Sequence, residues 1–77
     1  MHLSQAMLDE LELLNMFNLG TTQQGIKIHH DATPTRIAAA KRLYAKGMIT
    51  QADGGYLTSQ GQQTAEHVQA LVQMLSG

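Results

Sequence analysis

The sequence predicts one α+β domain in which three helices pack on a two- or three-stranded antiparallel sheet. Apolar residues recur at helical spacing in three segments, and short alternating runs lie between these segments. A chain of 77 residues has room for one hydrophobic core, so we expect residues 1–77 to form a single domain.

The first helix is expected from Ser4 to about Leu19. Ser4 suits the N-cap position, and Gly20 suits the end of a helix. The apolar residues at helical spacing should face the core: Met7, Leu8, Leu11, Leu14 and Phe17. The acids of this segment are placed on its outer, solvated face: Asp9, Glu10 and Glu12.

The second helix is expected over residues 34–46, after a polar connection at 21–25 and a short strand at 26–29. Thr33 caps it and Pro34 takes the first position, where an N–H is not needed. Its inward face should hold four side chains: Ile37, Ala40, Leu43 and Tyr44. Two cations four residues apart then point to solvent from roughly the opposite face: Arg42 and Lys46.

Residues 48–58 are expected to form a β-hairpin. A three-residue loop at Asp53-Gly54-Gly55 is preferred, because it puts Ile49 and Leu57 on the same face of the hairpin. Only that arrangement lets both side chains enter the core from one face.

The last helix begins after Thr58 or Ser59 and runs to about Leu75. An apolar stripe follows its length, with Met74 beside it: Ala65, Val68, Leu71, Val72 and Leu75. This stripe suits packing on the first helix and also suits a homodimer interface through the first and last helices. Both uses are left open by the sequence.

The second half of the chain resembles bacterial winged-helix regulators of the multiple-antibiotic-resistance type. In those proteins a helix ending in Leu-x-x-x-Gly-Leu-Ile leads into a hairpin wing, which closes with Leu-Thr-x-x-Gly. The matching residues here are Leu43, Gly47, Met48, Ile49, Leu57, Thr58 and Gly61. The resemblance implies a small winged-helix-like domain with residues 48–58 as its wing. The whole chain also resembles a family of short bacterial proteins of unknown function, which implies no activity.

Two departures from the regulator pattern concern DNA binding. Residues 20–32 show little helical pattern, so the helix that precedes a recognition helix is missing or vestigial. The wing carries Gln51 and Asp53 where arginine or lysine is usual.

The positive charge of the chain is confined to one window. The formal net charge is −1, yet every lysine and arginine lies between positions 27 and 46: Lys27, Arg36, Lys41, Arg42 and Lys46. These residues are the candidate contacts to double-stranded DNA, centred on helix 34–46. The alternative is an ordinary solvated helix face.

The sequence therefore predicts a binding domain and not an enzyme, acting as a DNA-binding accessory or regulatory protein. The alternative is a protein–protein adaptor that binds no nucleic acid.

Cysteine is absent, no serine lies in a nucleophile motif, and the glycines form no phosphate-binding loop, so no catalytic residue, metal or cofactor is expected. His29 and His30 are adjacent on an extended segment and so point to opposite sides. No apolar run is long enough to cross a bilayer, and a reducing cytoplasm is the expected compartment.

Overall fold

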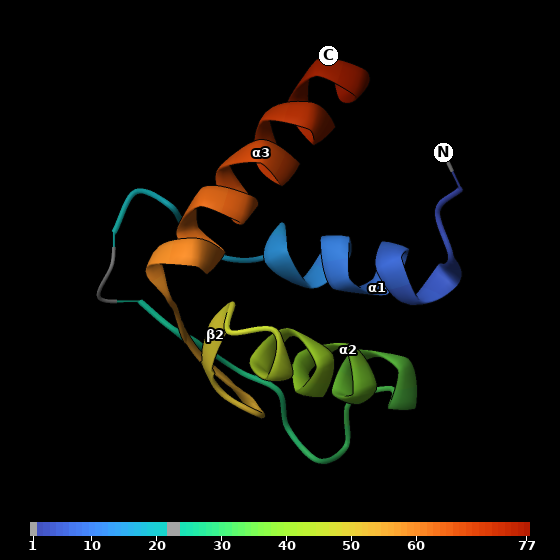
Figure 1. The fold of residues 1–77 in the computed structure, drawn as a ribbon, viewed down its shortest axis with the longest axis vertical. Helices are drawn as coiled ribbons and strands as arrows, with labels where there is room; N and C mark the ends of the chain where they lie inside the picture. The colour runs from blue at the N-terminus through green and yellow to red at the C-terminus, as the bar shows by residue number, and fades with distance from the viewer. Residues whose placement is uncertain (1, 22–23) are drawn as a thin grey trace.

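The computed structural model describes residues 2–21 and 24–77, and it confirms three helices with a three-stranded antiparallel sheet. The elements in chain order are α1 (Gln5–Leu14), β1 (Ile26–Lys27), α2 (Pro34–Ala45), β2 (Ile49–Gln51), β3 (Gly54–Leu57) and α3 (Ser59–Ser76). In the sheet, β3 lies between β1 and β2. The helices α1 and α2 lie side by side, and α3 rises away from the rest of the domain (Figure 1). Residues 22–23 of the predicted polar connection lie outside the described residues.

Hydroxyl side chains set the start of each helix. Ser4, Thr33 and Thr58 precede α1, α2 and α3, and each hydroxyl oxygen accepts a hydrogen bond from a backbone N–H three residues later, at 3.1, 3.3 and 3.0 Å. Each bond satisfies one of the N–H groups that a helix leaves free at its start. The predicted caps Ser4 and Thr33 are confirmed, and Thr58 caps the last helix, with Ser59 as its first residue.

The first helix ends at Leu14, so the predicted end at Leu19 is wrong. The chain turns after Leu14, and Phe17 enters the core, where it is only 4% exposed. The side chain of Gln69, in α3, donates hydrogen bonds to the backbone oxygens of Leu14 and Phe17 at 3.3 and 2.8 Å. The Leu14 carbonyl also accepts from the Phe17 N–H at 3.4 Å, so Gln69 adds to the hydrogen bonds of the turn that follows α1. The turn therefore depends on a residue far away in the sequence.

The core joins all three helices and the sheet. Its buried apolar residues, among those described, are Leu13, Leu14, Phe17, Ile28, Ala39, Ala40, Leu43, Ile49, Ala65 and Val68. Met7 and Leu8 were expected to face the core but are exposed, because α1 turns a neighbouring face inward. Leu13, on that face, is almost fully buried.

The inward face of α2 is centred on Ala39 and Leu43, whereas Tyr44, predicted to face inward, is half exposed. At about 100° per residue, the difference from the predicted face is a rotation of roughly 60° about the helix axis. Ala39 is fully buried, and its small side chain lets α2 approach the core closely. As a result, Arg42 and Lys46 lie on the flank of α2 and not on the side opposite its buried face.

The strands β2 and β3 form the predicted hairpin. Ile49 lies opposite Leu57, so the predicted shared face is confirmed. The predicted three-residue loop is wrong, because Gln51 pairs with Gly54 and only two residues remain in the turn. The extra residue of β3 instead forms a bulge between these two pairs, where Gly55 has a φ of +74°.

The end of α2 and the start of α3 meet at one junction. Gly47 ends α2 with a φ of +77°, a conformation that glycine adopts at little cost. The hydroxyl of Thr58 donates to the Gly47 carbonyl at 2.5 Å, and its backbone N–H donates to the Met48 carbonyl at 3.0 Å. Gly61 is then so close to Met48 that an added Cβ would lie 1.9 Å from the Met48 carbonyl oxygen. Only a residue without a side chain fits at this position.

We therefore expect Gly61→Ala to reduce the free energy of unfolding by about 2 kcal/mol or more, because the backbone of one element must move away from the other. Urea unfolding of the purified protein measures the change. Gln63→Ala, at an exposed position one turn into the same helix, is the control and should change stability by less than about 0.5 kcal/mol. Equal stability of the two variants would show that the junction is looser than described.

Candidate functional site

The predicted cationic surface is divided, because two of its residues are held by an acid from another helix. Arg42 donates from Nε to a carboxylate oxygen of Glu10 at 2.9 Å, and from Nη2 to the Ala6 carbonyl at 3.2 Å. Lys46 donates to the other carboxylate oxygen of Glu10. Glu10 is only 7% exposed and lies between the two cations.

Arg42 and Lys46 remain partly exposed, but the prediction that they point freely to solvent from the back of α2 is wrong, because both pair with Glu10. The solvated position predicted for Glu10 is also wrong. A signal for this pairing was present in the sequence. Glu10, Leu14 and Phe17 are spaced by four and three residues, so the acid shares the core-facing stripe of the first helix. A carboxylate on such a stripe requires a cation from another element.

The pKa of Glu10 reflects this environment. Burial alone raises the pKa of a carboxyl group, because it penalises the charged form. The hydrogen bonds and positive charges of Lys46 and Arg42 outweigh burial and lower the pKa of Glu10 below its usual value. Glu10 is therefore ionised in the folded protein at neutral pH.

Two of the other three cations, Lys27 and Lys41, line a cleft, and Arg36 does not. Lys27 pairs with Asp53 at 3.1 Å, with both side chains largely in solvent. Arg36 and Lys41 are exposed and make no ion pair with any residue that the structure describes. Of the five predicted DNA contacts, Lys27 and Lys41 therefore share one cleft, and Arg42 and Lys46 lie on the opposite flank of α2.

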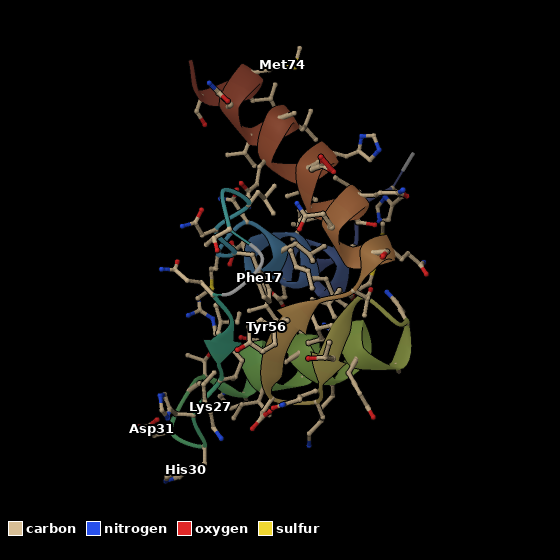
Figure 2. All side chains as sticks on the ribbon, turned by 90° about the vertical axis from the view of Figure 1, so that its left-hand side faces the viewer. Phe17, Lys27, His30, Asp31, Tyr56 and Met74 are labelled. Atoms are coloured by element: carbon tan, nitrogen blue, oxygen red, sulfur yellow. The ribbon has the colours of Figure 1, made fainter. Side chains whose placement is uncertain are left out.

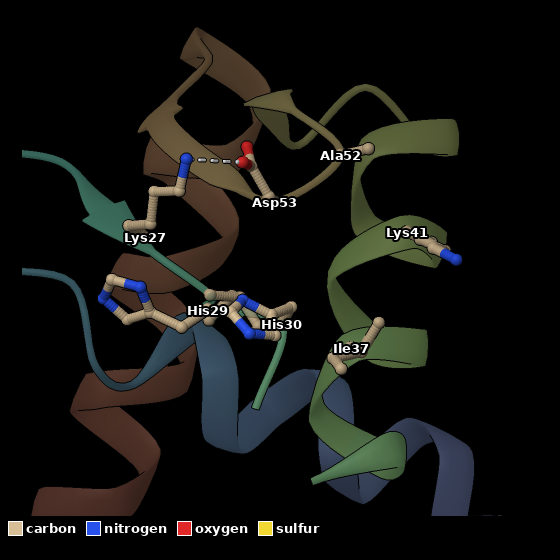
Figure 3. A pocket seen from close by; sticks show the side chains of 8 residues that line it. Lys27, His29, His30, Ile37, Lys41, Ala52 and Asp53 are labelled. Carbon is tan, nitrogen blue, oxygen red and sulfur yellow. Dashed lines mark ion pairs between the residues drawn. The ribbon is translucent and has the colours of Figure 1, made fainter. Parts of the chain in front are cut away.

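This cleft lies between the turn of the hairpin, the segment after β1, and α2 (Figure 3). It is open to solvent and has a volume of about 580 Å³. Ile28, Ile37 and Ala52 contribute apolar walls, and the ammonium of Lys41 points away from the other residues of the cleft (Figure 3). Since Lys27 is paired with Asp53 and the Lys41 ammonium points away, the polar groups that remain at the cleft include the two imidazoles of His29 and His30.

The histidine pair is part of this cleft. His29 and His30 both line it from neighbouring positions of the segment after β1 (Figure 3). Within residues 2–21 and 24–77, no three histidine or acidic side chains are placed to hold a metal ion.

A second surface lies at the end of α3. Ala65 and Val68, in the first half of the predicted stripe, are buried in the core. The second half is exposed: Leu71 by 53%, Val72 by 39% and Leu75 by 80%. Met74, further round the same helix, is 79% exposed and stands clear of the domain (Figure 2). We call Leu71, Val72 and Leu75 the tail face.

The tail face continues from a small groove between α1 and α3. Met7 of α1 and Thr64 of α3 line this groove, which has a volume of about 170 Å³. Leu71 and Leu75 follow Thr64 by seven and eleven residues and therefore lie on the same side of α3. The groove, which Glu10 and Lys46 also line, and the tail face therefore lie on the same side of α3.

The Glu10 cluster predicts a specific stability loss. Glu10→Gln should reduce the free energy of unfolding at pH 7 by about 1–3 kcal/mol, because it removes a buried charge that receives hydrogen bonds from two cations. Glu12→Gln, an exposed carboxylate on the same helix, should change stability by less than about 0.5 kcal/mol. Thermal or urea unfolding measures both, and equal losses would contradict the pairing.

The same cluster predicts a pH dependence. The pKa of Glu10 is lower in the folded than in the unfolded chain, so its contribution is complete above the unfolded value, about 4.3. It is lost as the pH falls through the lower, folded pKa. The stability difference between wild type and Glu10→Gln should therefore shrink steadily below about pH 4. A constant difference from pH 7 to pH 3 would argue against an ionised Glu10.

No helix within the described residues is long and apolar enough to cross a membrane. No curated protein and no solved structure matches the chain. A family of unknown function (DUF5669) matches residues 1–76. The chain therefore belongs to this family.

Proposed function

We propose that this protein is a protein-binding domain whose contact surface is the tail face of α3. The observation that carries the proposal is three large apolar side chains exposed on one side of a helix: Leu71, Val72 and Leu75. A single exposed apolar residue is common, but a contiguous group marks a surface that another molecule covers.

The charge of this region supports a protein partner. Residues 67–77 contain no aspartate, glutamate, lysine or arginine. The centres of protein–protein interfaces are similarly depleted of charge and rich in large apolar side chains, including methionine. At the inner end of the groove, the charge of Glu10 is compensated by its two cations. The tail face itself is therefore free of lysine, arginine and acidic side chains.

DNA binding through α2 is the second candidate. It is favoured by the hairpin that follows α2, as in winged-helix regulators, and by the grouping of Lys27 and Lys41 at one cleft. It is disfavoured because Arg42 and Lys46 are paired with Glu10, and Lys27 is paired with Asp53. Phosphate binding depends on the number of cations that are free to contact the backbone.

We expect the protein to act by binding rather than by catalysis, and in the cytoplasm, where a chain without cysteine loses nothing to the reducing conditions. A role as an adaptor in a regulatory complex fits a domain with one apolar contact surface.

Capture from cells of the native organism tests the tail face. Tagged wild-type protein should co-purify a specific partner, which is either an untagged copy or another protein. Leu71→Gln with Leu75→Gln should reduce its recovery at least tenfold, since two exposed interface centres become polar. Arg36→Gln with Lys41→Gln is the matched control, because it changes two exposed residues elsewhere and should leave recovery unchanged. Recovery that is insensitive to the tail variant would refute the proposed surface.

A DNA titration tests the second candidate. Among the described ion pairs, two of the four cations of α2 are already bound to Glu10, so few cations are free to contact phosphates. We therefore expect weak binding, with a Kd for mixed duplex DNA no tighter than about 100 µM at about 200 mM salt. Fluorescence anisotropy at about 50 and 200 mM salt provides the measurement. Micromolar binding at the higher salt that disappears in Arg36→Gln with Lys41→Gln would establish DNA binding in place of our proposal.

A further inference from the structure

We propose that Asp53 is a site of spontaneous aspartate isomerisation, which the paired sheet and the ion pair with Lys27 restrain in the folded protein. Asp53 lies in the turn between β2 and β3 and is followed by Gly54. The sequence contains three aspartates, and Asp53 is the only one that glycine follows. Asp53 lies on the hairpin and not on the tail face, so this proposal does not depend on the proposed function.

The reaction joins the side chain of the aspartate to the backbone of the next residue. The backbone nitrogen of Gly54 attacks the carboxyl carbon of Asp53 and forms a C–N bond. The hydroxyl group of the neutral carboxyl leaves as water with the proton of that nitrogen, and a five-membered succinimide ring results. Water then opens the ring at either carbonyl, which restores aspartate or gives isoaspartate. Water reaches this site, because the Asp53 side chain is 45% exposed.

Glycine favours this attack, and the fold requires glycine at position 54. A residue without a side chain leaves its backbone nitrogen open to the approaching carboxyl group. Gly54 has a φ of +124°, and an added Cβ would overlap the carbonyl oxygen of Ile26 in β1. The close approach of β1 to β3 therefore needs glycine at the position that also makes Asp53 reactive.

The folded hairpin restrains Asp53 through both its side chain and its backbone. The carboxylate pairs with the ammonium of Lys27 at 3.1 Å (Figure 3), and the backbone carbonyl accepts a hydrogen bond from the Ile28 N–H at 2.7 Å. Gly54 pairs with Lys27 in β1 and with Gln51 in β2. The attack requires rotation of the carboxyl group and movement of the peptide between Asp53 and Gly54. Both movements disturb these contacts, so we expect the reaction to proceed in molecules in which β1 has opened.

Isoaspartate at this position prevents β1 from pairing again. The backbone of isoaspartate runs through the side-chain carbon, so the chain is one carbon longer in the turn. The former backbone carbonyl of Asp53, which accepts from the Ile28 N–H, becomes a free carboxylate outside the backbone. Because β1 has only two residues, few other ladder bonds hold it to the sheet. The reaction thus makes a transient opening of the sheet permanent.

Incubation of the full chain at neutral pH for several weeks, with and without urea, tests the site. Peptide mapping separates the aspartate and isoaspartate forms of each peptide, and fragmentation identifies the isomer. Asp9 and Asp31 are internal controls, because Glu10 and Ala32 follow them. In urea, Asp53 should form isoaspartate at least about tenfold faster than either control, and folding should slow its reaction at least about tenfold. Equal rates at the three aspartates in urea, or equal rates at Asp53 with and without urea, would overturn the inference.

A variant pair tests the ion pair. Lys27→Gln should increase the rate of isoaspartate formation in the folded chain about twofold to fivefold, the factor that corresponds to loss of an exposed ion pair. Lys41→Gln is the matched control, because Lys41 lines the same cleft but its ammonium points away from the other cleft residues (Figure 3). Its rate should equal that of the wild type. Equal rates in the two variants would contradict the restraint by Lys27.

Amide hydrogen exchange tests the consequence for the sheet. The isoaspartate form is separated from the unmodified chain by chromatography, and exchange of both forms is followed by NMR. The Ile28 N–H should exchange at least about tenfold faster in the isoaspartate form, because its acceptor in the turn is lost. Equally slow exchange in the two forms would show that the sheet accommodates the modified residue and would overturn the proposed loss of β1.

Discussion

The pairing of buried Glu10 with Arg42 and Lys46 determines how the first two helices fit together. A carboxylate that is 7% exposed needs cations close to it, since burial of an unpaired charge is costly. The pair fixes the rotation of α2, which directs its two terminal cations to α1 and Ala39 into the core. The same rotation leaves Tyr44 half exposed on the other flank. The ion pairs between α1 and α2 and the burial of Ala39 thus require the same rotation of α2.

This contact also changes the functional meaning of the charge pattern. Along the sequence, all cations lie in one window, as expected for a surface that binds a polyanion. In the folded domain, acids from outside that window neutralise three of them: Glu10 pairs with Arg42 and Lys46, and Asp53 pairs with Lys27. The positive window is therefore used largely to hold the domain together. For this reason we propose the uncharged end of α3, and not the cationic window, as the surface for a partner.

Features set by neighbouring residues were predictable from the sequence. The caps Ser4 and Thr33 and the shared face of Ile49 and Leu57 depend on chemistry within a few positions, and all were predicted correctly. The end of α1 was not, because Gln69 supplies hydrogen bonds to the turn from the last helix. Helical periodicity identifies the apolar face of a helix only within a broad arc. It therefore did not predict the orientation of α2 about its axis, which differs from the predicted one by roughly 60°. The candidate cations were therefore identified, but their partner was not.

The position at which α1 ends affects how much of α3 is covered by the rest of the domain. The chain turns after Leu14, where Gln69 of α3 still bonds to the backbone, and the last turns of α3 beyond Gln69 stand clear of the other described elements (Figure 1). In a helix that simply ended in water, exposed positions would gain nothing from apolar side chains, and Lys or Gln would serve equally well. Val72 and Leu75 nevertheless continue the stripe of Ala65 and Val68 at the same spacing. The apolar stripe of α3 therefore continues past the part that its own domain buries, and this exposed part is the surface that we propose for a partner.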